Sequence, residues 1–238
     1  MTPPASALPS TLPSTLAPSA IAPQVLVLVA HPQMEQSRAN RKLMRAAQVL
    51  AGVQVRDLYA LYPDYLIDVE AEQAALAAAT LVVWQHPIHW YSMPPLMKLW
   101  VDEVLAFGWA YGPGGGALRG KDLWLVASTG GAEDSYRPQS YNRYFFDAFL
   151  PPYEQTAALC GMRFLPPLLL HGAHHLGPAE TAAHARVFAD RLATYPSWPE
   201  IDSVPDCVAC EVPQAARPAE PEALAARALP AEPAEEAR

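Results

Sequence analysis

A buried strand, an aromatic loop and the start of a helix are expected in the stretch Leu81-Val-Val-Trp-Gln-His-Pro-Ile-His-Trp-Tyr-Ser-Met-Pro-Pro95. Its first residues, Leu81 to Gln85, form the short apolar run that is typical of a strand buried on both faces of a parallel sheet. Pro87 is expected to end this strand, and Pro94-Pro95 to begin a helix. Aromatic and imidazole side chains crowd the loop between them. An open α/β sheet binds flat ligands at such a place, although a packed loop would have the same composition.

The composition predicts one central domain with two loose ends. Residues 1–23 are rich in Pro, Ser and Thr and carry no charge, whereas residues 196–238 are rich in Pro and Ala and contain nine acids against three bases. We expect both ends to be disordered, because neither can bury enough apolar surface to offset the chain entropy. Residues 24–195 are nearly neutral and long enough to form a proper core.

The charge pattern argues against nucleic acid as a partner, since phosphate binding needs many clustered bases. The one basic cluster is Arg38, Arg41, Lys42 and Arg45, which reads most simply as a solvated helix face. We find no secretory signal and no run of about 18 apolar residues, so a cytoplasmic protein is expected. Three cysteines give no disulfide framework, and Cys207-Val-Ala-Cys210 lacks further ligands, so no metal site is predicted.

The first strand of the domain is expected at Gln24 to Ala30, followed by a loop and a helix that closes at Gly52. Ser37 can cap this helix, whose unpaired N–H groups would attract an anion such as a phosphate. The loop has neither the G-x-G-x-x-G nor the G-K-[ST] pattern of other phosphate-binding loops. Among doubly wound folds this leaves a loop that wraps a flavin phosphate, while an ordinary capped helix stays an open alternative.

The remaining chain alternates between strand and helix patterns, which predicts a parallel sheet covered on both faces. A fourth strand leads into Ser128-Thr-Gly-Gly131, where glycines allow close approach to a ring and free N–H groups can donate to it. Residues 141–160 are expected to be helical, with a break at Pro151-Pro152. The fold class is therefore predicted to be a flavodoxin-like, doubly wound, five-stranded α/β sheet. The elements expected outside the central stretch are strands at 53–59, 121–128, 162–165 and 168–171, helices at 70–79 and 178–193, and an aromatic, glycine-rich segment at 107–116.

Four motifs together resemble the flavodoxin-like NAD(P)H:quinone oxidoreductases, and within them the ancillary oxidoreductase of glutathione-regulated potassium-efflux systems. They are His31-Pro32 with Ser37-Arg-Ala-Asn40, the stretch from Trp84 to Pro95, Phe107-Gly-Trp-Ala-Tyr-Gly112 and Ser128-Thr-Gly-Gly131. The resemblance implies FMN as the cofactor, with FAD left open. It implies that the cofactor is held by His31, Ser37, Arg38, Ala39, Asn40, Ile88, His89, Trp90, Tyr91, Ser128, Thr129, Gly130 and Gly131. The family usually has Gln where His89 stands.

The same resemblance implies two-electron transfer from NADH or NADPH to a quinone, in a homodimer with the flavin near the subunit interface. Tyr91, His86 and His89 are then candidates for catalytic proton delivery, against the alternative that they only pack and hold the loop. Two other functions remain open. The protein can be a regulatory subunit of a membrane potassium-efflux transporter, peripheral at the inner face of the membrane, or an electron carrier without an NAD(P)H site.

Overall fold

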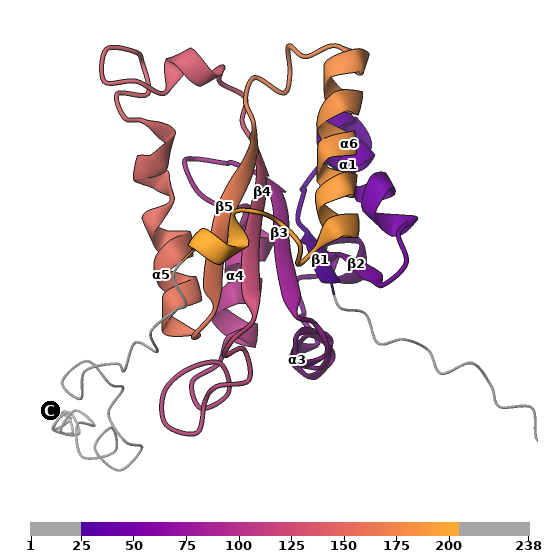
Figure 1. Cartoon of the computed structure of the whole chain (residues 1–238), viewed down its shortest axis with the longest axis vertical. Helices are drawn as coiled ribbons and strands as arrows, with labels where there is room; N and C mark the ends of the chain where they lie inside the picture. The colour runs from indigo at the N-terminus through magenta and orange to yellow at the C-terminus, as the bar shows by residue number, and fades with distance from the viewer. Residues whose placement is uncertain (1–24, 205–238) are drawn as a thin grey trace, which may run out of the picture.

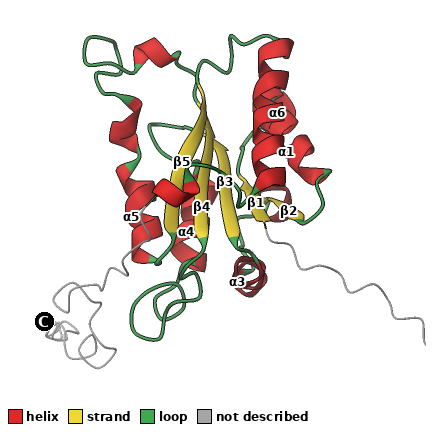
Figure 2. Ribbon diagram, viewed as in Figure 1, coloured by secondary structure: helices red, strands yellow, loops and turns green. Residues whose placement is uncertain are grey.

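Five parallel strands form one sheet in the order β2-β1-β3-β4-β5, with helices on both faces (Figures 1 and 2). The computed structural model describes residues 25–204. The strands are β1 (Val25–Val29), β2 (Val53–Asp57), β3 (Leu81–Pro87), β4 (Asp122–Ser128) and β5 (Arg163–Leu170). The α-helices are α1 (Arg38–Gln48), α2 (Leu58–Leu61), α3 (Val69–Ala78), α4 (Pro95–Val104), α5 (Pro151–Leu159) and α6 (Pro178–Thr194). The predicted fold class is confirmed.

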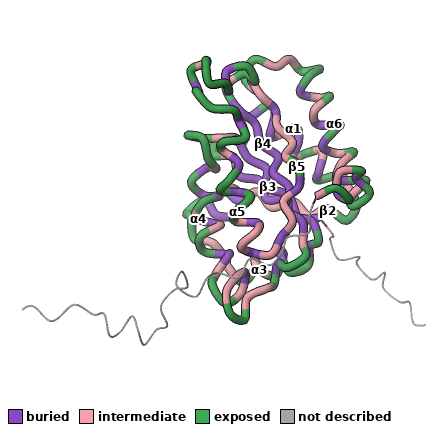
Figure 3. The backbone as a smooth tube through the Cα atoms, turned by 60° about the vertical axis from the view of Figure 1, so that its left-hand side comes forward, coloured by how far each residue is buried: buried purple, intermediate pink, exposed green. Residues whose placement is uncertain are grey.

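Two apolar cores lie on opposite faces of the sheet, because alternate strand residues point to opposite sides. On one face, Val27 and Val83 pack with α1 and α6; on the other, Leu28 and Trp84 pack with α3, α4 and α5. Strands β1, β3 and β4 are buried at every residue (Figure 3). This explains why their sequences are nearly continuous apolar runs rather than alternating ones.

A buried carboxylate ties the β2 edge of the sheet to two helices. Glu72 of α3 is completely buried and accepts hydrogen bonds from Arg56 of β2, Tyr62 and the indole N–H of Trp100 in α4, at 2.5 to 2.9 Å. A buried charge is tolerated only when it is paired and hydrogen-bonded in this way. These hydrogen bonds hold α3 and α4 against the β2 edge of the sheet. Helix α4 begins directly after the aromatic loop.

Three elements differ from the sequence prediction. The second strand stops at Asp57, which caps the short helix α2 by accepting the Ala60 N–H. Residues 141–145 are not helical, and Pro151-Pro152 begins α5 instead of breaking it, because proline is tolerated in a first helical turn. The two apolar pieces at 162–171 form the single strand β5, whose register shifts between Trp124 and Val126 of β4.

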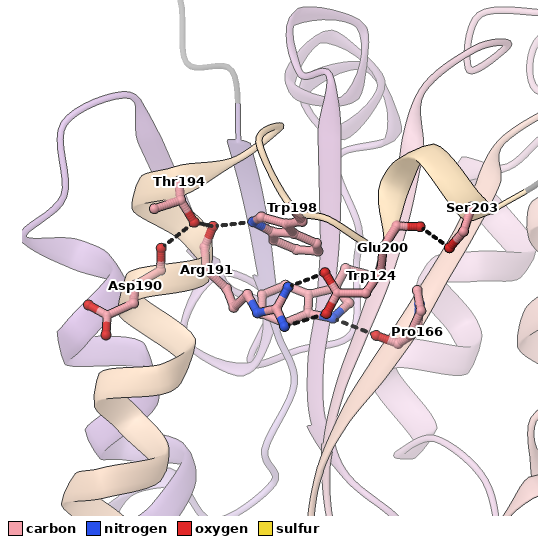
Figure 4. Close-up of polar contacts among 8 residues, drawn as sticks. All are labelled: Trp124, Pro166, Asp190, Arg191, Thr194, Trp198, Glu200 and Ser203. Carbon is pink, nitrogen blue, oxygen red and sulfur yellow. Dashed lines mark hydrogen bonds and ion pairs between the residues drawn. The ribbon is translucent and has the colours of Figure 1, made fainter.

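The segment 196–204 packs onto the domain, although we expected the disordered tail to begin at residue 196. Trp198 is buried against Trp124 at 4.8 Å between ring centroids, and its indole N–H donates to the Arg191 carbonyl at 2.8 Å (Figure 4). The guanidinium of Arg191 makes two hydrogen bonds to Glu200 at 2.5 and 2.8 Å. The packed domain therefore extends to at least Val204, because Trp198 and Ile201 of the Pro-rich segment are buried against the apolar core beside α6. The predictions for residues 1–23 and 205–238, including Cys207 and Cys210, lie outside the described residues.

Candidate functional site

A cavity of about 610 Å³ lies at the edge of the sheet where the parallel strands end. Loops that follow β1, β3, β4 and β5 all contribute to it, which is the position where doubly wound sheets bind ligands. Strands β1 and β3 are neighbours in the sheet, and the crossovers leave them toward opposite faces. The cavity is lined by His31, Pro32, Gln33, Gln36, Ser37, Arg38, Ala39, Asn40, Pro87, Ile88, His89, Trp90, Pro95, Ser128, Thr129, Gly130, Ala173 and His174.

The N-terminus of α1 opens into this cavity. Ser37 is the N-cap, and its hydroxyl oxygen accepts the N–H of Asn40 at 3.1 Å. The N–H groups of Arg38 and Ala39 have no acceptor inside the helix, as in any first turn. Together with the helix dipole and the Arg38 side chain, they make this end of the cavity suitable for a phosphate group. No Asp or Glu occurs among the described residues that line the cavity.

Hydrogen bonds from two strands hold the start of α1 in place. Gln85 of β3 donates to the carbonyl of Asn40 at 2.9 Å, and the Asn40 side chain donates to the Ser128 hydroxyl of β4 at 2.8 Å. All three residues are buried. The Oδ1 atom of Asn40 has no hydrogen-bond partner among the described residues. A buried acceptor beside a cavity normally has a partner, so this atom is available to a ligand hydroxyl or a water.

The aromatic rim is a tight turn in an uncommon conformation. His89 and Ser92 exchange both backbone hydrogen bonds, and the central residues Trp90 and Tyr91 have φ of 48° and 64°. These are the signs of a type I′ turn, which normally contains Asn or Gly because other residues are strained there. Trp90 is 93% exposed, whereas Tyr91 stacks on Phe149 at 5.1 Å between ring centroids. The turn thus presents a large aromatic ring to solvent at the edge of the cavity.

Two histidines that line the cavity, His31 and His89, have lowered pKa values. Burial, together with the neighbouring His89 and His174, lowers the pKa of His31 to about 4. Its Nδ1 accepts the N–H of Gln33 at 3.1 Å, so the ring proton sits on Nε2. Burial also lowers the pKa of His89. The site therefore presents imidazole N–H donors at neutral pH without adding positive charge.

Eleven of the thirteen predicted cofactor-binding residues line the cavity. Tyr91 instead packs outward on Phe149, and its hydroxyl lies 3.4 Å from the Asn142 side-chain oxygen. Gly131 faces Ser135 and Tyr141, which a Cβ atom at this position would meet at 2.7 and 2.8 Å. It does not line the cavity, but its carbonyl anchors the Thr129 hydroxyl at 2.7 Å.

His86 lies in a different place from the one that its predicted catalytic role requires. It is the sixth residue of β3 and points to the face of the sheet that carries α5, where it stacks on Tyr153 at 5.7 Å. It is completely buried, does not line the cavity, and burial lowers its pKa to about 4. The strand continues to Pro87, so alternation turns this side chain into the core. Proton delivery by His86 at the cavity was a wrong prediction.

Sequence reasoning missed the part of the cavity that follows β5. Ala173 and His174 line it, and the His174 carbonyl accepts a hydrogen bond from Arg38 at 3.1 Å. The signal was present, because the rule that strand ends converge applies to the fifth strand as well. The other residues that were missed are Pro32, Gln33, Gln36, Pro87 and Pro95, which close the loops around the predicted ones.

These features define a doubly wound α/β protein whose ligand site combines a phosphate-accepting helix end with an aromatic rim. The chain belongs to a protein family with a flavodoxin-like fold, and the model of that family matches residues 23–194. Within residues 25–204 there is no cluster of three or more metal-ligating side chains, and none of the helices has the length and apolar character that a membrane crossing requires.

A relative from Citrobacter koseri, the glutathione-regulated potassium-efflux system ancillary protein KefF, is 47% identical over 171 residues, which is 72% of this chain and 96% of the relative. The general stress protein 14 of Treponema denticola, solved in complex with FMN, is 36% identical with a TM-score of 0.68, covering 71% of this chain and 98% of that one. An NADPH-quinone reductase from P. pentosaceus is 28% identical with a TM-score of 0.64, and the match covers 70% of this chain and 96% of that one.

Proposed function

We propose that this protein is an FMN-dependent NAD(P)H:quinone oxidoreductase. The observation that carries the proposal is that a phosphate-accepting helix end, a strained aromatic turn and a glycine turn meet at one cavity of about 610 Å³. A cavity of this size is typical for a cofactor of this kind. The FMN complex of the Treponema protein and the quinone reductase from P. pentosaceus have the same fold over the same part of the chain.

The residues present fit the cofactor at each end of the cavity. Ser37, Arg38, Ala39 and Asn40 would hold the phosphate, and the free Oδ1 of Asn40 would accept from a ribityl hydroxyl. Ile88, His89 and Trp90 would lie along the ring. On the far side, the backbone N–H groups of Gly130 and Gly131 make no hydrogen bond to a described backbone carbonyl.

Bound FMN would supply the acceptor for hydride from NAD(P)H and the donor of two electrons to a quinone. The protein needs only to position the reactants and stabilise charge. The backbone donor at Gly130, which lines the cavity, would favour a ring edge that becomes negative, without reorganising. His89 and the Tyr91 hydroxyl remain candidates for moving a proton to the quinone oxygens, Tyr91 at a greater distance because it lies outside the cavity lining.

A homodimer is part of the proposal. Several aromatic side chains are exposed in the single chain, and exposed aromatic patches mark interaction sites. Three of them, Tyr141, Tyr144 and Phe145, come from the segment between β4 and α5. A second copy would cover this surface and wall the cavity. The name of the Citrobacter relative also supports a role as an ancillary protein of a potassium-efflux system. A peripheral position at the inner face of the membrane, beside the transporter, belongs to this second proposal.

The test is the visible spectrum of the purified protein and its oxidation of NADH and NADPH with a benzoquinone. We expect a yellow protein with FMN identified by mass. Gly130→Leu should lower the flavin content, because its side chain would meet His174, whose ring lies 3.3 Å from a Cβ at this position. Gly177→Ala, outside the cavity, serves as the matched control. A colourless protein that does not take up added FMN would refute the proposal.

A further inference from the structure

A second cavity, of about 340 Å³, lies between α1 and the first turn of α6. We call it the basic groove. It is lined by Arg38, Arg41, Lys42, Arg45, Leu176, Pro178 and Thr181, so four cations face two apolar side chains and one hydroxyl. The four bases recur at the spacing that places them on one face of α1. No acid occurs among the described residues that line the groove.

The positive charge of this groove is hardly compensated within residues 25–204. Arg41 pairs with Glu35 at 3.7 Å, but the Glu35 side chain is 96% exposed. Lys42 and Arg38 donate only to the carbonyls of Pro178 and His174. Like charges three and four residues apart on a helix repel one another and destabilise it. An anion in the groove would remove this cost.

We propose that the acidic C-terminal segment 220–236 of the same chain docks in the basic groove. The segment contains Glu220, Glu222, Glu232, Glu235 and Glu236 against the single base Arg227, so five carboxylates meet four cations. Leu224, Leu229 and its prolines match the apolar side of the groove formed by Leu176 and Pro178. The proposed function uses only Arg38 of the groove's four cations, and it does not use this segment.

The chain is long enough for this contact. The last described residue, Val204, follows a segment bonded to Arg191 in the last turn of α6, while the groove lies at the other end of that helix. Seventeen helical residues span about 26 Å. Fifteen residues, 205–219, lie between Val204 and Glu220, and this length of chain can span up to about 50 Å when extended. The family match ends at residue 194, so this segment lies outside the part of the chain that the family model covers.

Docking there would act on the main cavity through Arg38, which lines both cavities. Carboxylates beside Arg38 would weaken its attraction for a phosphate in the main cavity. The tail therefore becomes an internal, salt-sensitive regulator of cofactor affinity. This consequence rests on the proposed function, whereas the docking itself does not.

Carbodiimide cross-linking of the full chain, read by mass spectrometry, tests the docking. The chain has only three lysines, Lys42, Lys98 and Lys121. Lys42 lies in the groove, whereas Lys98 lies on α4 at the opposite face and pairs with Asp102. We expect amide links from Lys42 to the tail glutamates, formed within one chain in a mixture of ¹⁵N-labelled and unlabelled protein. These links should fall at least threefold in Arg45→Glu, and again in 1 M salt, where charges are screened within about 3 Å.

Equal linking of the tail to Lys98 and Lys42, or links only between labelled and unlabelled chains, would overturn the docking. FMN affinity is the second measurement. The full-length variant with all five tail glutamates changed to Gln should bind FMN about two- to fivefold more tightly at low salt, and equally at 1 M salt. Unchanged affinity at low salt would overturn the regulatory effect. Absence of any FMN binding would instead refute the proposed function and leave the cross-linking result intact.

Discussion

Asn40 and Ser128 are 88 positions apart in sequence, and the Nδ2 of Asn40 donates to the Ser128 hydroxyl at 2.8 Å. This buried contact joins the phosphate end of the cavity to the glycine turn. Ser128→Ala should lower the free energy of unfolding by about 1 to 2 kcal/mol, because it leaves a buried amide donor unpaired. It should also weaken FMN binding. Urea denaturation and flavin titration measure both effects, and Ser197→Ala, at an exposed serine, should change neither.

Glu72→Gln should be among the most damaging single changes that leave the cavity lining untouched. The carboxylate accepts from Arg56, Tyr62 and Trp100 and is completely buried. Removing its charge leaves the Arg56 guanidinium without its partner, at a cost of about 3 kcal/mol. Urea denaturation should show this loss, whereas Glu103→Gln, on the exposed side of α4, should stay within about 0.5 kcal/mol. A loss below 1 kcal/mol for Glu72→Gln would contradict the prediction.

Stability should fall between pH 6.5 and pH 4, in part because of His86. Burial lowers the pKa of His86 from 6.5 to about 4 in the folded protein. Above pH 6.5 the ring is neutral in both states; below it the unfolded chain binds a proton that the folded protein does not, so stability is lost as the pH falls. The full effect is up to about 3 kcal/mol.

His86→Phe should reduce this pH dependence, because it keeps the stacking on Tyr153 and removes the titrating group. Unfolding measured at several pH values between 4.5 and 7.5 gives the slope directly. The exposed His175→Gln is the control and should keep the slope of the original protein. Equal slopes in His86→Phe and the original protein would show that His86 titrates normally.

Trp90→Gly should separate stability from ligand binding. Trp90 has a φ of 48°, which costs a non-glycine residue about 1 to 2 kcal/mol, and glycine loses a similar amount through chain entropy. Stability should therefore change by less than about 1 kcal/mol. FMN affinity should drop about tenfold with the loss of an aromatic contact, and Trp90→Phe should restore most of it. A large loss of stability in Trp90→Gly would mean that the ring supports the fold.

Trp198 should contribute much more than the Arg191–Glu200 ion pair to holding the segment 196–204 on the domain. Trp198 is buried against Trp124 and Phe188, so Trp198→Ala should cost about 3 kcal/mol. The hydrogen bonds from Arg191 lower the pKa of Glu200 to about 2. Both side chains are nevertheless more than a third exposed to solvent. Glu200→Gln should therefore destabilise the protein much less than Trp198→Ala does. Thermal unfolding of the two variants compares them, and a reversed order would contradict this account.

The sequence allowed the buried strands and the phosphate end of the cavity to be predicted, because both depend on local patterns. Strands β1, β3 and β4 are apolar throughout, and Ser37 caps α1 as its position indicated. Two secondary-structure predictions that were based on prolines were wrong. Pro151 begins a helix, and Pro166-Pro167 is accommodated in β5, because β5 is an edge strand where a missing donor has little cost.

The direction of a side chain near a strand end was harder to predict. His86 and His89 are three residues apart and looked equivalent in sequence, but one continues β3 into the core and the other lies at the cavity. A one-residue change in where the strand ends reverses this outcome. Trp198 was assigned to a loose end because its neighbours are prolines, although a single large ring can bury enough surface to anchor a short segment.

The first and last described residues, Val25 and Val204, lie on the same side of the domain. Val25 opens β1, and the Ile201 carbonyl near Val204 accepts from Arg163, the first residue of β5. Both points therefore lie at the amino edge of the sheet, opposite the cavity. An electrode or sensor chip that captures the domain through either point would leave the mouth of the cavity facing the solution, so small reactants could enter without passing the support.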